Sequence, residues 1–398
     1  MNNKENSPFT PGSPVPVELF VGRSERIKEL FRYIGQILSG KQENIFLTGD
    51  RGIGKSSLAS FLRYYANTEK NMLGIHVFLG GVSTLEDMVQ HIFDQILKET
   101  KGQAWFEDIT KFFGRHVKKI GMFGISVSFN PSKEDLKELV RKFPEAINNL
   151  LNKLKKRQKR GLFIVLDDIN GLVEKTEFAN WYKSFVDEIA VQYKNFPVLL
   201  MLLGLPEKRD TLSNLQPSLM RIFRVVGIEK LSDKEVKDFL SKAFAKADLE
   251  VQPEALTLMA HFSSGLPLLM HEIGDAVFWV NNDGLIDKKD AVRGIYAAAQ
   301  KIGEKYLDPK VYNAIRSSKY KSILRKLGEI GVSRHFKKKE VEAKLTENEK
   351  KVFHNFLRRI RDLGVIKADS EKGRGVYSFV NEIYPLYIKM ESEKSKKS

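Results

Sequence analysis

The sequence predicts an α/β protein with a three-layer core, a helical region after it, and a small domain of helices and strands at the C-terminal end. Three observations support this fold class. Five apolar runs alternate with helical stretches up to residue 230, a mainly helical segment covers 231–315, and residues 316–398 read as three helices followed by a hairpin. Strands that alternate with helices favour a parallel sheet covered by helices on both faces.

The composition limits the classes of function open to the chain. Its 398 residues include no cysteine, which excludes disulfides, cysteine-based metal sites and thiol catalysis. The first 18 residues lack the apolar segment of a secretory signal, and the longest apolar stretch, 196–206, is shorter than the ~20 residues of a membrane span. We therefore expect a cytoplasmic protein with no membrane partner. Residues 1–17 are expected to form a flexible N-terminal arm.

The first apolar run leads into a glycine-rich turn, GDRGIGKSS. The run at 44–49 reads as a strand and the stretch at 55–66 as a helix, so the turn fits the P-loop pattern. In that pattern glycines let backbone amides face phosphate oxygens, and the helix N-terminus favours negative charge. We expect Lys55 to contact the β- and γ-phosphates of ATP and Ser56 to bind Mg²⁺. The predicted set is Gly49, Gly52, Gly54, Lys55, Ser56 and Ser57.

A second run, GLFIVLDDIN, supplies the carboxylates that a P-loop requires. It reads as a buried central strand that ends in Asp167 and Asp168. The carboxyl ends of parallel strands face the ligand crevice, so we expect Asp167 to hold Mg²⁺ through water and Asp168 to polarise the attacking water. The alternative is a pair of surface acids that ends a strand. The runs at 73–80, 196–204 and 224–231 complete the five strands.

The segment ELFVGRSERIKEL resembles the segment that opens AAA+ ATPases of the initiator and STAND types, and 231–244 and 261–278 resemble their helical lid. The resemblance implies a P-loop NTPase with an AAA+-like core at 18–230 and a lid at 231–315. An insertion at about 99–135 would contain a hairpin that turns near Gly124. The resemblance also implies a set of residues near the adenine, namely Phe20, Val21, Gly22, Arg23 and Pro267.

Two positions depart from the AAA+ pattern. The fourth strand ends in Gly204 and Leu205, where those proteins usually carry a polar residue, and the lid has His271 where an arginine is usual. We therefore expect slow or partner-stimulated hydrolysis. Arg221, with Arg224 as the second choice, precedes the fifth strand, where related proteins place an arginine finger that acts on a neighbouring subunit. That role implies a homo-oligomer, and the alternative is a surface arginine paired with an acid.

The C-terminal region carries most of the net charge. Residues 316–398 contain 22 Lys and Arg against 11 Asp and Glu, which is +11 of the chain's +16. A basic end region attracts polyanions, most often nucleic acid. Thr346 and Glu349 form a capping-box pattern before a third helix, 347–364, and two strand-like runs follow around SEKGRG. Three helices and a basic-tipped hairpin predict a winged helix-turn-helix domain.

In such a domain the third helix enters the major groove and the hairpin loop, or wing, meets the backbone or minor groove. We therefore expect DNA as a partner. The predicted DNA-binding residues are Lys351, Asn355 and Arg358 on the third helix and Lys372 and Arg374 at the wing tip. The alternative is a winged helix that contacts a protein partner, as in many STAND-type proteins.

These features together favour an ATP-dependent molecular switch. It would bind and hydrolyse ATP with Mg²⁺ and so control DNA binding or DNA loading through the winged helix. Two alternatives stay open. One is a STAND-type regulatory NTPase in defence or stress signalling, and the other is a target-selecting ATPase of a mobile element.

Overall fold

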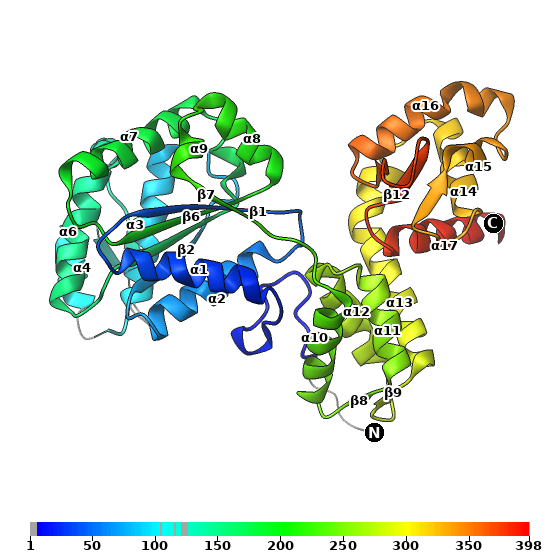
Figure 1. The fold of residues 1–398 in the computed structure, drawn as a ribbon, viewed down its shortest axis with the longest axis horizontal. Coiled ribbons are helices and arrows are strands. Elements are labelled where there is room, and N and C mark those ends of the chain that lie inside the picture. Colours follow the sequence, from blue (N-terminus) through cyan, green and yellow to red (C-terminus); the bar gives the residue numbers. More distant parts are fainter. Residues whose placement is uncertain (1–5, 104–105, 115–116, 121–125, 398) are drawn as a thin grey trace. The chain divides into compact units, whose positions relative to one another are not determined.

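The computed structural model describes residues 6–103, 106–114, 117–120 and 126–397, and they form two compact units (Figure 1). Residues 16–229 form the core unit. The described residues before 16 pack with those from 230 onward, and we call this the C-terminal unit. Within the described ranges, no helix is both long and apolar enough to cross a membrane.

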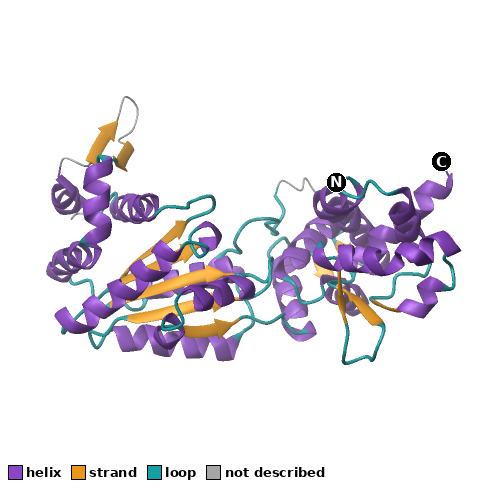
Figure 2. Ribbon diagram, turned by 90° about the horizontal axis from the view of Figure 1, so that it is seen from above, coloured by secondary structure: helices purple, strands orange, loops and turns teal. Residues whose placement is uncertain are grey.

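A five-stranded parallel sheet lies at the centre of the core unit (Figure 2). Its strands are β1 (Glu43–Thr48), β2 (Leu73–Phe78), β5 (Leu162–Asp167), β6 (Val198–Gly204) and β7 (Arg224–Gly227). They lie in the order β2-β5-β6-β1-β7, so β6 separates the strand before the P-loop from the strand that ends in Asp167. Every residue of β5 and β6 is buried, as expected for strands covered on both faces. All five predicted strands are confirmed.

Helices cover both faces of this sheet and give the predicted three layers (Figure 1). One layer consists of α1 (Ser24–Ile37) and α2 (Lys55–Thr68). Alternate strand residues, among them Ile75, Val77 and Leu166, face the other layer and form the main core with it. That layer contains α3 (Leu85–Thr100), α6 (Phe143–Lys156), α7 (Thr176–Gln192), α8 (Pro206–Leu215) and α9 (Leu219–Ile222).

The predicted insertion begins at the end of α3 and contains several short elements. They are α4 (Phe106–Phe113), β3 (Val117–Ile120), β4 (Ser126–Phe129) and α5 (Lys133–Arg141). β3 and β4 pair antiparallel, and the turn predicted near Gly124 lies outside the described residues. Phe129 at the end of β4 is 2% exposed and packs edge-on against Phe93 of α3, so this hairpin is anchored to its own unit.

The first half of the C-terminal unit is the predicted helical lid region. It contains α10 (Asp233–Ala245), α11 (Pro253–Ser263), α12 (Pro267–Val280), α13 (Lys288–Ile302) and the small pair β8 (Glu250–Val251) and β9 (Leu285–Ile286). Phe9, within the segment expected to be a flexible arm, is 4% exposed here. Its ring lies 4.8 Å from that of Phe244, and a Cβ on Gly274 would come within 2.3 Å of it. This segment is therefore anchored at Phe9.

The second half of the unit begins with a π-helix, η4 (Gly303–Tyr312), that continues α13. Its elements are α14 (Ser318–Gly328), β10 (His335–Lys337), α15 (Lys338–Glu342), α16 (Glu347–Asp362), β11 (Ile366–Ala368), β12 (Val376–Phe379) and α17 (Ile383–Lys397). The strands form an antiparallel sheet in the order β10-β12-β11. Phe353 and Phe356 of α16 pack into one core with Leu324 of α14. This region thus contains the three helices and the hairpin that the sequence predicts.

Candidate nucleotide site and candidate nucleic-acid interface

The P-loop is shaped by two glycines in left-handed backbone and by one buried anchor. Gly52 has a φ of 76° and Gly54 a φ of 91°, a region that side chains disfavour. Ile53 between them is 1% exposed and fixes the turn in the core. A Cβ on Gly49 would lie 3.0 Å from the carbonyl oxygen of Ile228, so the turn rests against the chain that leaves β7.

Lys55, the first residue of α2, lies against this turn. Its Nζ donates to the carbonyl oxygens of Gly49 at 2.7 Å and Asp50 at 3.0 Å. Burial lowers the pKa of Lys55, while the carboxylates of Asp167, Asp50 and Glu207 oppose that shift. A partly buried ammonium group binds an anion more strongly than an exposed one, because less water competes for it. The position therefore suits a phosphate group.

Oxygen donors of the type that Mg²⁺ prefers lie at the start of α2 and the end of β5. Ser56 Oγ makes no hydrogen bond within the described part of the chain, and Asp167 is 7% exposed. No group of three or more His, Cys, Asp or Glu among the described residues could hold a metal by itself. The donor set therefore fits a Mg²⁺ ion that also takes phosphate oxygens from a nucleotide, and not a metal held by protein alone.

Asp168 follows β5 in left-handed backbone, with a φ of 58°. Its Oδ2 lies 3.2 Å from the position of a Cβ on Gly80, in the loop after β2. Asn170 donates to its other carboxylate oxygen. Because β2 and β1 lie on opposite sides of β5, the carboxylate of Asp168 is turned away from the P-loop strand in this structure.

A histidine joins the two sides of the candidate metal site. His76 of β2 is 6% exposed, and its Nε2 lies 2.9 Å from Oδ2 of Asp167. Its Nδ1 lies 3.2 Å from Oγ of Ser60, which is on α2 one turn after Ser56. Phe78 stacks on the imidazole with ring centroids 4.4 Å apart. The helix that starts at the P-loop is thus linked by side chains to the candidate metal carboxylate.

The segment predicted to face the adenine packs on α2 and the P-loop. Phe20 stacks on Phe61 of α2 with ring centroids 4.8 Å apart. Val21 is half-buried, and Gly22 and Arg23 follow in left-handed backbone with φ values of 77° and 59°. The Arg23 guanidinium donates to the carbonyl oxygen of the buried P-loop isoleucine. The structure therefore brings these predicted residues to the P-loop.

The two candidate finger arginines differ in their surroundings. Arg224 forms a two-pronged ion pair with Glu43, with distances of 2.7 Å and 3.1 Å, and lies 4.6 Å from the centre of the Tyr33 ring. The hydrogen bonds that Arg224 donates to Glu43 raise the pKa of Arg224. Arg221 on α9 is exposed and has no ion pair within the described ranges. Arg221 is thus free to reach a neighbouring molecule, whereas Arg224 stabilises its own unit.

Pro267 lies in the C-terminal unit, at the first position of α12, where a missing N–H costs no helical hydrogen bond. Ser264 and Gly265 precede it in left-handed backbone, with φ values of 53° and 68°. A Cβ on Gly265 would lie 2.3 Å from the carbonyl oxygen of Leu231, so only glycine fits. Leu231 in turn donates its N–H to Gly265 at 2.9 Å. The turn is thus locked to the start of its own unit.

The five predicted DNA-binding residues are all exposed. Lys351, Asn355 and Arg358 follow one another at helical spacing on α16, opposite its buried face, and Lys372 and Arg374 lie in the loop between β11 and β12. Among the described residues none of the five has an ion-pair partner. The structure places the three helix residues on one face, as the sequence predicts, and the other two on a separate loop.

A cavity of about 450 Å³ opens beside that face of α16, between the helix and the start of α14. Arg316 and Arg359 line it without an ion-pair partner in the described part of the chain, and Arg358 contacts only His354, at 3.4 Å. The complete lining is Ala314, Ile315, Arg316, Ser317, Tyr320, Asn355, Arg358, Arg359 and Asp362. Unpaired guanidinium groups that converge on a concave surface suit an anionic ligand.

Sequence reasoning missed two residues at the nucleotide end of the core unit. His76 is the one polar side chain in an otherwise apolar strand, LGIHVF, and that break in the pattern is a signal for a buried hydrogen bond. Glu207 lies three residues beyond Gly204, in the first turn of α8, and its charge acts on Lys55. The sequence gives no sign of this proximity, because it depends on how α8 packs.

Comparisons with known proteins agree with this geometry. Residues 19–183 match the family model described as AAA ATPase domain, which confirms the predicted resemblance for this segment. An uncharacterized HTH-type transcriptional regulator of Methanocaldococcus jannaschii is 20% identical over an alignment of 323 residues that covers 75% of this chain and 75% of the relative.

Two solved structures share the fold over nearly the whole chain. The Walker-type ATPase of Pyrococcus abyssi has a TM-score of 0.54 at 14% identity and covers 93% of this chain and 96% of its own. The ORC2 protein of Aeropyrum pernix in its ADP form also has a TM-score of 0.54 at 14% identity, covering 97% and 98%. Residues 19–183 are therefore similar to an AAA ATPase domain, and the chain shares its fold with these two solved structures.

Proposed function

We propose that the protein is an ATP-dependent switch. The core unit would bind ATP with Mg²⁺ and hydrolyse it, and the C-terminal unit would bind DNA with an affinity that the nucleotide controls. Lys55 and the P-loop amides would hold the phosphates, and Ser56 and Asp167 would hold Mg²⁺, which stabilises the charge that develops on the phosphates. Asp168 would orient the attacking water after a rotation of its side chain.

The observation that carries the switch is a short path from the P-loop to the lid turn, in which two noncovalent contacts are joined by three residues of chain. The carbonyl oxygen of Ile228 lies against Gly49, and its N–H donates to Thr48 at 2.8 Å. Three residues later in the chain, Leu231 is locked to Gly265. A change in the P-loop on phosphate binding would therefore act directly on the chain segment that enters the C-terminal unit.

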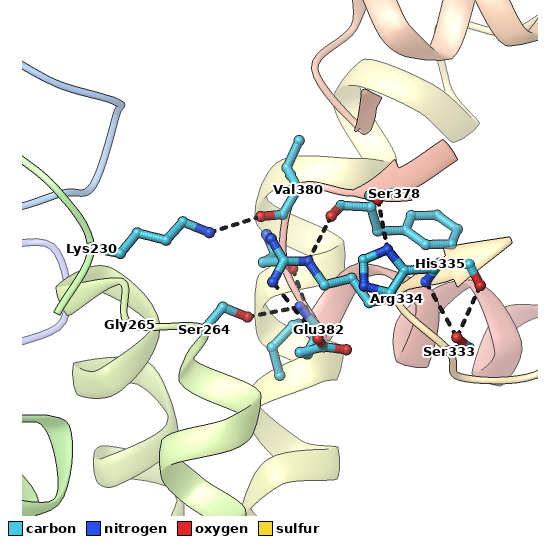
Figure 3. Close-up of polar contacts among 12 residues, drawn as sticks. Lys230, Ser264, Gly265, Ser333, Arg334, His335, Ser378, Val380 and Glu382 are labelled. Carbon is cyan, nitrogen blue, oxygen red and sulfur yellow. Dashed lines mark hydrogen bonds and ion pairs between the residues drawn. The ribbon is translucent and has the colours of Figure 1, made fainter. Parts of the chain in front are cut away.

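Figure 3 shows the hydrogen bonds that join Lys230 of this entry segment, and Ser264 of the lid turn, to the chain just after β12. Lys230 donates to the carbonyl oxygen of Val380 at 3.3 Å, and the Ser264 hydroxyl accepts from the N–H of Glu382 at 2.9 Å. Arg334 donates to the carbonyl oxygen of Phe379 at 3.2 Å. The entry segment and the lid turn thus hold the chain just after β12, the strand that closes the wing, and this supports nucleotide control of the DNA-binding region.

The proposal of DNA as the partner rests on charge and shape in the region of α14 to β12. Its exposed α16 face borders the arginine-lined cavity, and residues 316–398, which contain this region, carry a net charge of +11. Both features suit the phosphate backbone of duplex DNA, with α16 in the major groove. The regulator name of the Methanocaldococcus relative and the AAA ATPase match agree with an ATPase that acts on DNA.

Salt dependence of DNA affinity tests this assignment. Each phosphate contact contributes a slope of about 0.9 in log affinity against log salt, so Lys351→Ala, Arg358→Ala, Lys372→Ala and Arg374→Ala should each lower the slope by about 1. Asn355→Ala should leave the slope unchanged and reduce discrimination between sites by about 1–3 kcal/mol, because a carboxamide can read an adenine edge. Lys70→Ala is the matched control, because Lys70 lies in the core unit and is far in sequence from the four substituted residues. Unchanged slopes in all four charge variants would refute the assignment.

If the salt slopes of the four charge variants do not change, the binding of a protein partner is the favoured second function. The same exposed face would then bind a protein partner, as expected for a STAND-type regulatory NTPase in defence or stress signalling. A target-selecting ATPase of a mobile element would bind DNA without a preferred site. Arg221, which is exposed and has no ion-pair partner among the described residues, also supports a homo-oligomer in which it reaches the nucleotide of a neighbour.

A further inference from the structure

We propose that His76 is a positioning residue for the metal carboxylate Asp167, and that it makes Mg²⁺ binding depend on the helix α2. This inference rests on the proposed nucleotide site. It concerns a residue outside the P-loop and outside the strand that carries the two aspartates. Three buried or half-buried groups carry it: the carboxylate of Asp167, the imidazole of His76 and the hydroxyl of Ser60.

The hydrogen bonds define what each group does. A carboxylate oxygen only accepts, so at 2.9 Å the Nε2 of His76 must carry the proton and donate to Oδ2 of Asp167. In the neutral ring Nδ1 is then the acceptor, and at 3.2 Å it takes the hydroxyl proton of Ser60. One carboxylate oxygen is thereby fixed, and the other, Oδ1, is left for the metal shell.

Register in the sheet explains why these groups meet. His76 and Phe78 alternate with Ile75 and Val77, which face the main core, so their side chains point to the opposite face, toward α2. Phe78 pairs in register with Asp167, which places the carboxylate on that same face. The ring of Phe78 then lies over the imidazole and limits its rotation.

The hydrogen bond between Ser60 and His76 connects the Asp167 carboxylate to α2. Ser60 lies four residues after Ser56, so the two hydroxyls are on one side of the helix. The same helix would therefore supply the Ser56 hydroxyl that could bind Mg²⁺ and would also orient, through Ser60 and His76, the Asp167 carboxylate. A partner that orients a ligating carboxylate contributes about 10- to 100-fold to metal affinity.

Mg²⁺ titration of nucleotide binding tests the proposal. Affinity for a fluorescent ATP analogue is measured with purified full-length protein against Mg²⁺ concentration, and again in EDTA. His76→Leu should raise the Mg²⁺ concentration at half-effect by at least tenfold, and leave the affinity in EDTA unchanged. His76→Gln keeps an N–H donor near the Nε2 position and should recover most of the loss. Ser60→Ala, which removes only the outer link, should raise the half-effect about threefold. His91→Leu, an exposed histidine on α3, should match the wild type.

The outcomes separate this proposal from the one it rests on. If nucleotide binding by the wild type does not respond to Mg²⁺, the proposed nucleotide site fails. Suppose that nucleotide binding by the wild type responds to Mg²⁺, and that His76→Leu and Ser60→Ala have the same Mg²⁺ concentration at half-effect as the wild type. Then only the positioning role fails. A loss in EDTA equal to the loss in Mg²⁺ would assign His76 a purely structural role. Should His76→Leu not fold, Ser60→Ala and His76→Gln decide the matter by the same comparison.

Discussion

The nucleotide end of the core unit and the α16 face of the C-terminal unit are built in opposite ways. At the nucleotide end of the core unit, Lys55, Asp167 and Arg23 are buried or half-buried and hydrogen-bonded within the unit, as Asp167 is to His76 and Arg23 to the P-loop, whereas Asp168 is exposed. On α16 the candidate residues are exposed and make few contacts. Arg316 and Arg359 line the same cavity as Asn355 and Arg358. The first site is defined by its internal geometry, whereas the second is defined by charge and shape.

This difference predicts how each site responds to substitution. A change in the bonded site removes a group that its neighbours need, so single substitutions there should have large and specific effects. A change on the exposed face removes one of several similar charges, so single substitutions there should have small effects that add.

Lys55→Ala should show the largest effect on nucleotide binding. The variant removes the ammonium group that lies in the P-loop, so affinity for a labelled ATP analogue should fall at least about 100-fold, the loss expected for a desolvated charged contact of ~3 kcal/mol. Lys70→Ala, on the loop after α2, is the control and should bind like the wild type. Retained nucleotide affinity in a folded Lys55→Ala protein would end the P-loop assignment.

Arg221→Ala should act on the rate of hydrolysis and leave nucleotide binding unchanged, if the protein acts as an oligomer. Loss of a finger arginine lowers the rate of hydrolysis by about 10³-fold or more. Mixing this variant with Asp168→Asn protein should restore part of the activity, because only a shared site allows each to supply what the other lacks. Arg224→Ala should instead lower the melting temperature, since it breaks the pair with Glu43. No recovery at any mixing ratio in an oligomeric sample would contradict a role in trans.

Glu349→Gln extends the comparison, because Glu349, in the first turn of α16, is a buried and hydrogen-bonded residue on the same helix as the exposed face. Its carboxylate is 5% exposed, accepts from the N–H of Thr346 at 2.7 Å and pairs with Lys326 at 2.5 Å. Burial alone would raise the pKa of Glu349, but the bonds from Lys326 and Thr346 outweigh it and lower the pKa to about 2. We expect the variant to lose about 1–2 kcal/mol of unfolding free energy at pH 7.

The pH dependence of that loss follows from the direction of the shift. A lowered pKa in the folded state stabilises the protein above the ordinary pKa of glutamate, and this stabilisation disappears as the pH falls toward 2. Urea unfolding at pH 7 and pH 3 should therefore show a smaller difference between variant and wild type at pH 3. An equal difference at both pH values would show that Glu349 acts by packing and not by charge.

The same contrast explains what could be predicted from the sequence. The glycine pattern, the strand that ends in two aspartates and the capping box at Thr346 are local signals, and the structure contains the strands and helices that they indicate. His76 and Glu207 reach the site only through strand register and helix packing, which bring together residues far apart in the chain. The polar break in β2 marks a buried bond but does not name its partner. The cavity at Arg316 depends on how α14 packs against α16, and no local pattern encodes that.

The central claim is that nucleotide bound by the core unit controls DNA binding by the C-terminal unit. Its most direct test is the affinity for one DNA duplex with and without a slowly hydrolysed ATP analogue, in wild type, Lys55→Ala and Ser264→Ala proteins. We predict at least a fivefold difference in the wild type, within the usual range of coupling between two sites. The difference should vanish in Lys55→Ala and shrink in Ser264→Ala, which loses the bond to Glu382. Equal DNA affinity with and without the analogue, in wild-type protein shown to bind both ligands, would contradict the account.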